Sequence, residues 1–512
     1  MKRLISILLC AALLAAVLCG CGTEETPYVP TGDALDYGDG SSNQTTPSTP
    51  EQDLTMVYYS DHTMNPYNAT DFTNRALFSL LYQGLFSVDR DYNVTPILCS
   101  GYSVSSDMKT YTFQIADARF SDGTALTAGD VVASLEAAKA GSYYSGRFLH
   151  ITSIQEAGGA VVIQLDTPFQ NLPLLLDIPI VKASEAASED PLGTGPYVMD
   201  GSIGGKRLRR QAAWWCSSEA DLIITSSYIP LVEAKSPSQI RDQFEFEDVG
   251  LVCADPGSDT YADYRCDFEL WDCENGLFLY LVCNAKSTVF SIDSVRQALT
   301  HAIDRDTLVE NYYRGFARSA TLPASPLFPY YDATLAARYG YDKEKFTNAL
   351  TEADLQGAAV TMLLNSDDSL RLRVGRSIAK MLTECGLEVT LLEKNSKEFV
   401  EFLRYGEYDL YLGQTKLSAN MDLTAFFRSN GSLNYGGLAD TAIYTMALEA
   451  LANSGNYYSL HELVMEDAQL CPILFRSYAV YATRGLVTDL EPSRDNVFYY
   501  TLGKTMADIL QS

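Results

Sequence analysis

The chain has 512 residues, of which 47% are hydrophobic and 20% are charged, proportions that are typical of globular proteins. Its formal net charge is −28, which argues against nucleic acid as a partner because that binding needs clustered lysine and arginine. The basic run at 206–210 is interpreted as an exposed strand or turn. The length leaves room for two or three lobes.

The first 21 residues have the pattern of a secretory signal. Lys2 and Arg3 precede an apolar run from Leu4 to Cys19, which is shorter than the roughly 20 residues that a membrane-spanning helix needs. Cys21 has leucine three positions before it and glycine on either side, which resembles a bacterial lipobox. That resemblance implies cleavage after residue 20 and lipidation of Cys21. An ordinary secretory signal that happens to contain cysteines is the alternative.

Residues 21–53 are expected to form the lipidated cysteine and a flexible stalk. Large apolar side chains are scarce there, whereas Thr, Pro, Gly, Ser and Asp are frequent, a composition that cannot support a core. The protein is therefore expected at the extracytoplasmic face of the cell membrane, held by its lipid.

Strand and helix patterns alternate after residue 53. Strands are predicted at Leu54–Tyr59, Tyr111–Ile115 and Val161–Leu165. Helices are predicted at Phe72–Leu81, from a capping box at Thr127 to Ala140, and from a cap at Ser291 through Ile303, with a second helix to about Arg314.

The clearest run lies between residues 359 and 412. Strands are predicted at Ala359–Leu364, Glu388–Leu392 and Tyr408–Leu412, with helices at Asp367–Cys385 and from a cap at Ser396 to Tyr405. These lengths indicate parallel pairing with right-handed crossovers. Ligands bind outside the carboxyl ends of such strands, so the pattern points to Asn365–Ser366 and to Gly413–Lys416.

Catalytic and metal motifs have little support. No G-x-S-x-G elbow, P-loop or G-x-G-x-x-G occurs, and Met465 stands where the second histidine of a zinc helix beginning at His461 would be needed. No metal and no cofactor are expected. Eight cysteines remain after residue 21, with Cys266 and Cys273 the closest pair, and the sequence leaves disulfides and free thiols equally open.

Five motifs in order resemble the oligopeptide- and dipeptide-binding family (family 5) of extracellular solute-binding proteins of ABC importers. They are Phe120–Gly123 leading to Asp130–Val132, Gly193–Tyr197 followed by Trp214-Trp215, Val295–Leu299 with Ala302–Arg305, Tyr408–Leu410, and Pro472–Phe475. Residues 216–265 look unlike the family, and the sequence assigns them no function.

The resemblance implies an α/β, two-lobed periplasmic-binding-protein-like fold of class II. It implies a first lobe at 54–276 with an extra subdomain near 86–168, a second lobe at 277–476, and a return to the first lobe at 477–512. Hinge strands are expected at Leu277–Cys283 and at about Ile473–Val480.

The same resemblance implies a monomeric, lipid-anchored binding component that captures a peptide or peptide-like solute for an ABC permease and has no enzymatic activity. The alternatives are a binding protein for another solute, such as a metal chelate or modified peptide, and an extracellular hydrolase or a non-transport sensor on the same fold. The ligand itself stays open.

Gly413 matches the family's glycine, but Gln414 replaces its usual tryptophan, and no acid follows before Asp422. Either another acid binds the ligand's amine, or Lys416 faces the cleft and selects an anionic or otherwise unusual ligand. The expected ligand-binding residues are Asn65 and Tyr67 in the first lobe, and Gly413, Gln414, Thr415, Lys416, Asn434 and Tyr435 in the second.

Overall fold

The computed structural model describes residues 54–201, 205–261, 263–494 and 496–510. The predicted signal, Cys21 and the stalk lie outside these residues. Within the described part, no helix is both long and apolar enough to cross a membrane.

The N-terminal part of the described chain is built on short parallel strands. β1 (Met56–Tyr59) pairs in parallel with β10 (Tyr228–Ala234) and with β11 (Leu251–Ala254). β9 (Arg207–Arg210) and β8 (Tyr197–Asp200) continue the sheet beyond β10 in antiparallel order. The helices α2 (Phe72–Arg75), α3 (Phe78–Leu81) and α5 (Pro237–Glu245) accompany these strands.

A separate antiparallel sheet follows in the chain. Its order is β4-β5-β7-β6, formed by Cys99–Val104, Thr110–Ile115, Ala160–Leu165 and Ile151–Ala157 in that order. The helix α4 (Ala128–Ala140) packs on it, and a hairpin of β2 (Phe86–Val88) and β3 (Val94–Pro96) precedes it. The C-terminal α15 (Met506–Leu510) contacts β3 and β4.

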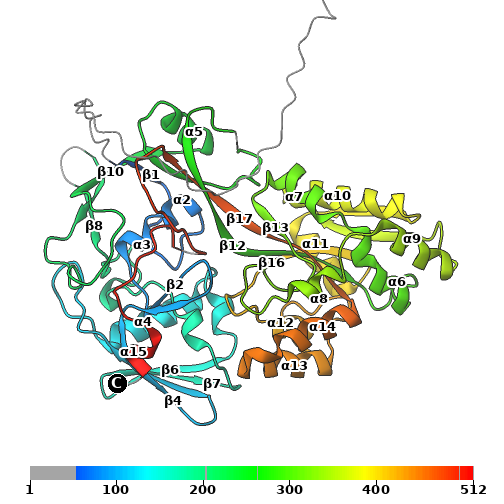
Figure 1. The fold of residues 1–512 in the computed structure, drawn as a ribbon, viewed down its shortest axis with the longest axis horizontal. Helices are drawn as coiled ribbons and strands as arrows, with labels where there is room; N and C mark the ends of the chain where they lie inside the picture. The colour runs from blue at the N-terminus through cyan, green and yellow to red at the C-terminus, as the bar shows by residue number, and fades with distance from the viewer. Residues whose placement is uncertain (1–53, 202–204, 262, 495, 511–512) are drawn as a thin grey trace, which may run out of the picture. The chain divides into compact units, whose positions relative to one another are not determined.

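Two long strands continue from this region into the rest of the molecule. β12 (Phe268–Cys283) and β17 (Leu470–Thr483) pair antiparallel along almost their whole length and lie side by side in Figure 1. β17 pairs at its far end with β11, while β12 pairs at its other end with β16 (Leu410–Lys416). We use "first lobe" for residues 54–267 and 484–510, and "second lobe" for residues 284–469.

The second lobe contains a parallel unit of three strands. β14 (Ala359–Asn365) pairs in parallel with β15 (Glu388–Lys394) on one side and with β16 on the other. Its other elements are α6 (Asp293–Ala298), α7 (Arg305–Tyr313), β13 (Ala317–Ser319), α8 (Ala333–Ala337), α9 (Lys343–Glu352), α10 (Ser369–Glu384), α11 (Ser396–Tyr405), α12 (Thr424–Phe427), α13 (Thr441–Ala452) and α14 (Tyr457–Asp467).

Hydrophobic cores lie on both faces of this sheet. In the second lobe one core includes Leu410, Leu412 and Val374, and the opposite core includes Tyr411, Phe426 and Leu460. Successive residues at the start of β16 therefore point to opposite cores, which is why Leu410, Tyr411 and Leu412 are all apolar.

Most of the predicted elements are confirmed. The run from 359 to 412 forms the expected parallel unit, and the Thr127 capping box is present with Asp130. The second lobe's β16 extends four residues beyond the predicted end at Leu412. The α/β two-lobed fold class is confirmed.

Three local predictions are wrong. The helix expected at 72–81 is divided into α2 and α3 at Ala76-Leu77, where the N–H of Leu77 bonds the carbonyl of Asn74, three residues back instead of four. Ser291 does not cap α6, since its hydroxyl donates to the carbonyl of Thr288. Ser396 is the first residue of α11, whose cap is Asn395.

The predicted lobe boundaries stay a prediction. The two inner boundaries, 276/277 and 476/477, fall inside β12 and β17, at the point where the pairing of these strands shifts register between Glu274 and Phe278. The predicted hinge segments lie within the same two strands.

Candidate functional site

The end of β16 offers a free backbone edge. β12 pairs with β16 through to Lys416, but β14 reaches only Leu410 and Tyr411. Among the described strands, residues 412–415 consequently have no strand partner on the side away from β12. Such an edge can accept an extended peptide as an added strand.

Lys416 connects this edge to the first lobe. Its Nζ donates a hydrogen bond of 2.6 Å to the hydroxyl of Tyr143 and lies 3.8 Å from the centre of that ring. The guanidinium of Arg75 lies 3.3 Å from the same ring centre. The lysine therefore lies between the two lobes, which is one of the two alternatives that the sequence left open. Its ammonium group contacts the same tyrosine ring as the guanidinium of Arg75.

Gln414 belongs to a polar chain that also crosses between the lobes. Its Oε1 is 3.5 Å from Nη1 of Arg476 on β17, and Nη2 of Arg476 lies 2.8 Å from Oδ2 of Asp255, just after β11. Burial alone would lower the pKa of Arg476, but the charge of Asp255 outweighs it and the pKa is raised. Arg476 is therefore a permanent cation between the strand edge and the first lobe.

The neighbouring strand explains why position 413 is a glycine. A Cβ at this position would lie 2.5 Å from ring atoms of Tyr280 on β12, and real Cβ atoms do not approach so closely. The glycine is thus required by the neighbouring strand, whether or not a ligand also approaches it.

Asn65 and Tyr67 are buried within the first lobe. The Asn65 side-chain amide donates to the carbonyls of Ala186 and Ser188, at 2.9 and 2.7 Å. The Tyr67 hydroxyl donates to the carbonyl of Pro179 at 2.9 Å. Both side chains hold loops of the first lobe together, and the structure does not bring them to residues 413–416.

Asn434 and Tyr435 lie apart from the strand edge as well. They line a surface depression with Lys286 and Arg404, which none of the residues 413–416 lines. The Asn434 side chain closes its own loop by bonding Ser429 and Ala439. The eight predicted binding residues therefore do not form one cluster. Of those in the second lobe, Lys416 contacts the first lobe through Tyr143, and Gln414 is connected to it through Arg476.

The first lobe has a pocket at its own strand ends. β1, β10 and β11 are parallel, and their carboxyl ends are Tyr59, Ala234 and Ala254. A pocket of about 250 Å³ lies there, where ligands bind open α/β sheets. It is lined by Tyr59, Thr70, Asp71, Phe72, Thr73, Pro237, Ile240, Arg241, Cys253, Ala254, Asp255, Ser258, Tyr261, Tyr264 and Tyr478.

This pocket could hardly be predicted from the sequence. Its residues come from five separate stretches, and most of them lie in residues 216–265, where the sequence shows none of the quoted motifs. The only local signal was the strand of Leu251–Ala254 ending in Asp255-Pro256-Gly257, which is typical of a strand followed by a turn.

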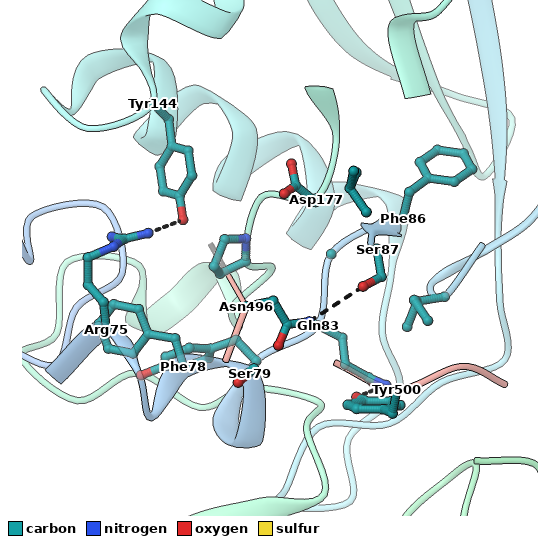
Figure 2. Close-up of a pocket in the computed structure, with 15 residues that line it drawn as sticks. Arg75, Phe78, Ser79, Gln83, Phe86, Ser87, Tyr144, Asp177, Asn496 and Tyr500 are labelled. Atoms are coloured by element: carbon teal, nitrogen blue, oxygen red, sulfur yellow. Dashed lines mark hydrogen bonds between the residues drawn. The ribbon is translucent and has the colours of Figure 1, made fainter. Parts of the chain in front are cut away.

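A smaller cavity inside the first lobe is a structural feature. It holds about 50 Å³, enough for one or two water molecules. Figure 2 shows its polar groups already bonded to each other: Arg75 to the Tyr144 hydroxyl and Gln83 to the Tyr500 hydroxyl, both at 2.8 Å. This cavity is too small for a peptide.

A buried histidine joins the lobes near α12. Nδ1 of His150 is 2.9 Å from a carboxylate oxygen of Asp166, and Nε2 is 3.2 Å from Asp422 and 3.0 Å from the hydroxyl of Thr424. Burial would lower the pKa of His150, but its hydrogen bonds and attraction to Asp422 and Asp166 outweigh burial and raise it. The two carboxylates therefore favour the protonated form of the imidazole.

Metal ligands and disulfides are not found in the described residues. No group of three or more His, Cys, Asp or Glu residues there is placed to hold a metal ion. None of the eight cysteines in this part forms a disulfide, and all but Cys266 are buried. Cys266 and Cys273, the pair that the sequence left open, are therefore not bridged, and the sulfur of Cys273 donates to the carbonyl of Ser493 at 2.8 Å.

Comparison with known proteins gives a consistent family. The family model described as bacterial extracellular solute-binding proteins, family 5 (middle region) matches residues 93–436. Glutathione-binding protein GsiB of Escherichia coli (strain K12) is 25% identical over 354 residues, covering 65% of this chain and 68% of the relative.

Two solved structures share the fold. The ABC transporter substrate-binding protein CtaP of Listeria monocytogenes superposes with a TM-score of 0.70 at 16% identity, over 88% of this chain and 99% of that one. NikA of Brucella suis, solved in complex with Fe(III)-EDTA, has a TM-score of 0.66 at 20% identity, over 87% of this chain and 98% of that one.

Proposed function

Because the chain belongs to family 5 of the bacterial extracellular solute-binding proteins, we propose that it captures a peptide or peptide-like solute between its lobes and presents it to an ABC permease. GsiB binds glutathione, which is a small peptide, and CtaP is a transporter's substrate-binding protein. Both matches support this function over a catalytic one.

The unpaired edge of β16 is the observation that carries the proposal. Residues 412–415 offer backbone N–H and C=O groups that a peptide backbone can satisfy, so affinity would come from the ladder and selectivity from the side chains around it. Gln414 and Lys416 frame this edge through their contacts with Arg476 and Tyr143.

Closure of the lobes would follow from the position of the edge. A ligand on β16 contacts the first lobe only when the lobes are together, so its binding energy favours the closed form. X-ray scattering should show that the protein contracts when a tightly bound ligand is added. Dimensions that stay constant under saturating ligand would contradict closure.

Calorimetric titration of Lys416→Ala and Gln414→Ala tests the placement of the ligand. A charged hydrogen bond contributes about 1.5–3 kcal/mol, so the Lys416 variant should bind an anionic peptide at least about tenfold more weakly. Lys286→Ala is the matched control, since Lys286 lines the separate depression with Asn434 and Tyr435. Unchanged affinity in the double variant at 414 and 416 would exclude this placement.

Membrane anchoring is part of the same proposal. The lipobox-like sequence around Cys21 supports cleavage after residue 20 and acylation of the cysteine, which would hold the protein at the outer face of the membrane. Cys21→Ser should release the protein from the membrane fraction. Full retention of that variant after signal cleavage would exclude a lipid anchor.

Two alternatives are tested together with the ligand. NikA of Brucella suis was solved with a metal chelate, which supports a chelate as second candidate. Native mass spectrometry of the protein from its host gives the mass of any bound solute and separates peptide from chelate. Incubation with that solute separates binder from hydrolase, since only an enzyme consumes the compound that stabilises it.

A further inference from the structure

The pocket at the carboxyl ends of β1, β10 and β11 has an unusual lining. Five aromatic rings face it, all of them partly exposed: Tyr59, Phe72, Tyr261, Tyr264 and Tyr478. Large aromatic side chains are usually covered in a folded protein, and a cluster of partly exposed rings around a hollow marks a binding surface.

The rings are held in place by their neighbours. Phe72 stacks on Tyr478 with ring centres 4.1 Å apart. Tyr264 lies 4.3 Å from the buried Tyr481, whose hydroxyl is 2.6 Å from that of Tyr261. These contacts fix the walls before any ligand arrives, so little entropy is lost in ordering them.

The charged groups of the lining already have partners. Asp255 binds Arg476 through both carboxylate oxygens, at 3.0 and 2.8 Å. Asp71 caps α2 and lies 3.2 Å from His62, and Arg241 lies 2.5 Å from Asp242. In the part of the lining that the structure describes, no charged side chain lacks a partner, so the pocket favours an uncharged ligand group.

The volume of the pocket limits the size of the ligand group that it can bind. Ligand pockets that enclose a drug-sized molecule hold about 300–1,000 Å³, whereas this pocket holds about 250 Å³. It is therefore large enough for one aromatic or branched apolar side chain but not for a whole peptide.

The pocket also adjoins the proposed peptide-binding edge. Asp255 on its rim binds Arg476, and Arg476 in turn contacts Gln414 of β16, so one guanidinium separates the pocket from the strand. Alternate side chains of an extended peptide point to the same side. A peptide paired with 412–415 that points one set of side chains towards Arg476 would place them beside the pocket.

We propose that this pocket, lined by Tyr59, Phe72, Tyr261, Tyr264 and Tyr478, is a specificity pocket that receives one aromatic or large apolar side chain of a bound peptide. The inference rests on the proposed peptide-binding function and names the substrate class: peptides that carry such a residue at one fixed position. The pocket, rather than the strand edge, distinguishes them from other peptides.

Tetrapeptides test this assignment. Tetra-alanine is compared by calorimetry with the four peptides that carry a single phenylalanine, and the best position is then changed to Trp, Leu, Lys and Glu. One phenylalanine position should bind at least about tenfold more tightly than alanine, equivalent to about 1.4 kcal/mol. Trp and Leu should retain the gain, while Lys and Glu should lose it.

Two variants of one loop locate the effect. Ser258 lines the pocket and Thr260 does not, and their hydroxyls bond each other at 2.9 Å. Ser258→Trp and Thr260→Trp both lose that bond, but only the first places an indole in the pocket. The phenylalanine preference should disappear in Ser258→Trp and persist in Thr260→Trp. Thr70→Trp repeats the test from the opposite wall if the first variant fails to fold.

The possible failures differ in meaning. Binding of all tetrapeptides with equal affinity would refute the specificity pocket and leave the peptide-binding function standing. Tighter binding of the lysine-containing tetrapeptide than of the phenylalanine-containing one would refute the proposal that the pocket binds an apolar side chain. Loss of the preference in both loop variants would place the effect elsewhere. No binding of any peptide would refute the proposed function itself and this inference with it.

Discussion

His461 should make the second lobe sensitive to acid. The side chain is completely buried on α14, and neither ring nitrogen has a hydrogen-bond partner among the described atoms. Burial alone lowers the pKa of His461 to about 4, against about 6.5 for a free histidine. The native ring is therefore neutral at any pH where the protein is expected to work.

The direction and size of the change in stability with pH follow from the linkage between protonation and folding. Below pH 6.5 the unfolded chain takes up a proton that the native ring refuses, so the native state loses stability as the pH falls towards 4. Between pH 7.5 and pH 5 this one group should lower the free energy of unfolding by about 2 kcal/mol, and below pH 4 by about 3 kcal/mol.

Urea unfolding of the wild type and His461→Leu at pH 7.5 and pH 5 measures this contribution. Leucine removes the titrating group and keeps an apolar side chain of similar size. The wild type should lose about 2 kcal/mol more than the variant between the two pH values. The variant's own stability at pH 7.5 is the control for packing. Equal losses in both proteins would refute a buried neutral histidine.

Three further substitutions test single contacts by the same unfolding measurement. His150→Ala leaves the buried Asp422 without its cation and should lower the free energy of unfolding by about 3 kcal/mol at pH 6. Because the pKa of His150 is raised, this loss should become smaller as the pH rises past that pKa. A loss that stays constant with pH would contradict the ion pair. Gly195→Ala places a Cβ 2.5 Å from backbone atoms of α3 and should cost about 1–3 kcal/mol, unlike Gly201→Ala, which meets open space. Thr127→Ala removes the cap of α4 and should cost about 1 kcal/mol; no loss would mean that the cap is dispensable.

The parallel unit of the second lobe could be predicted because its signals are local. Apolar runs of strand length alternate with amphipathic helices of full length, and Gly386 and Gly406 end the helices in conformations with positive φ that glycine adopts easily. Each signal lies within a few residues of the element that it specifies, so the sequence alone places them closely.

The errors arose where distant residues decide the structure. Asn74, just before the point where the predicted helix divides, bonds β1 fifteen residues away. Asn65 and Tyr67 follow the first strand, as expected of binding residues, but bond loops more than 100 residues later in the chain. Such polar contacts leave no periodic signal in a single sequence.

The candidate site was only partly predictable for the same reason. The rule of carboxyl strand ends led to residues 413–416, since β16 was visible in the sequence. The first lobe's strands β10 and β11 lie in residues 216–265 and were not predicted, so Asp255 and the tyrosines near it were missed. The link from Asp255 to Arg476 joins residues 221 positions apart.

The pairing of β11 with β17 also sets the order in which the molecule can be assembled. Leu251 lies opposite Ala482 in this ladder. The chain must therefore be synthesised as far as residue 482 before the sheet of the first lobe can be completed. Contacts of such separation form slowly, and until then β11 has an open edge that another chain could occupy. The unit of β14, β15 and β16 lies within residues 359–416, so it can form as soon as those residues have been synthesised. During synthesis, which proceeds from the N-terminus, the lobe that begins first is thus the last to be completed.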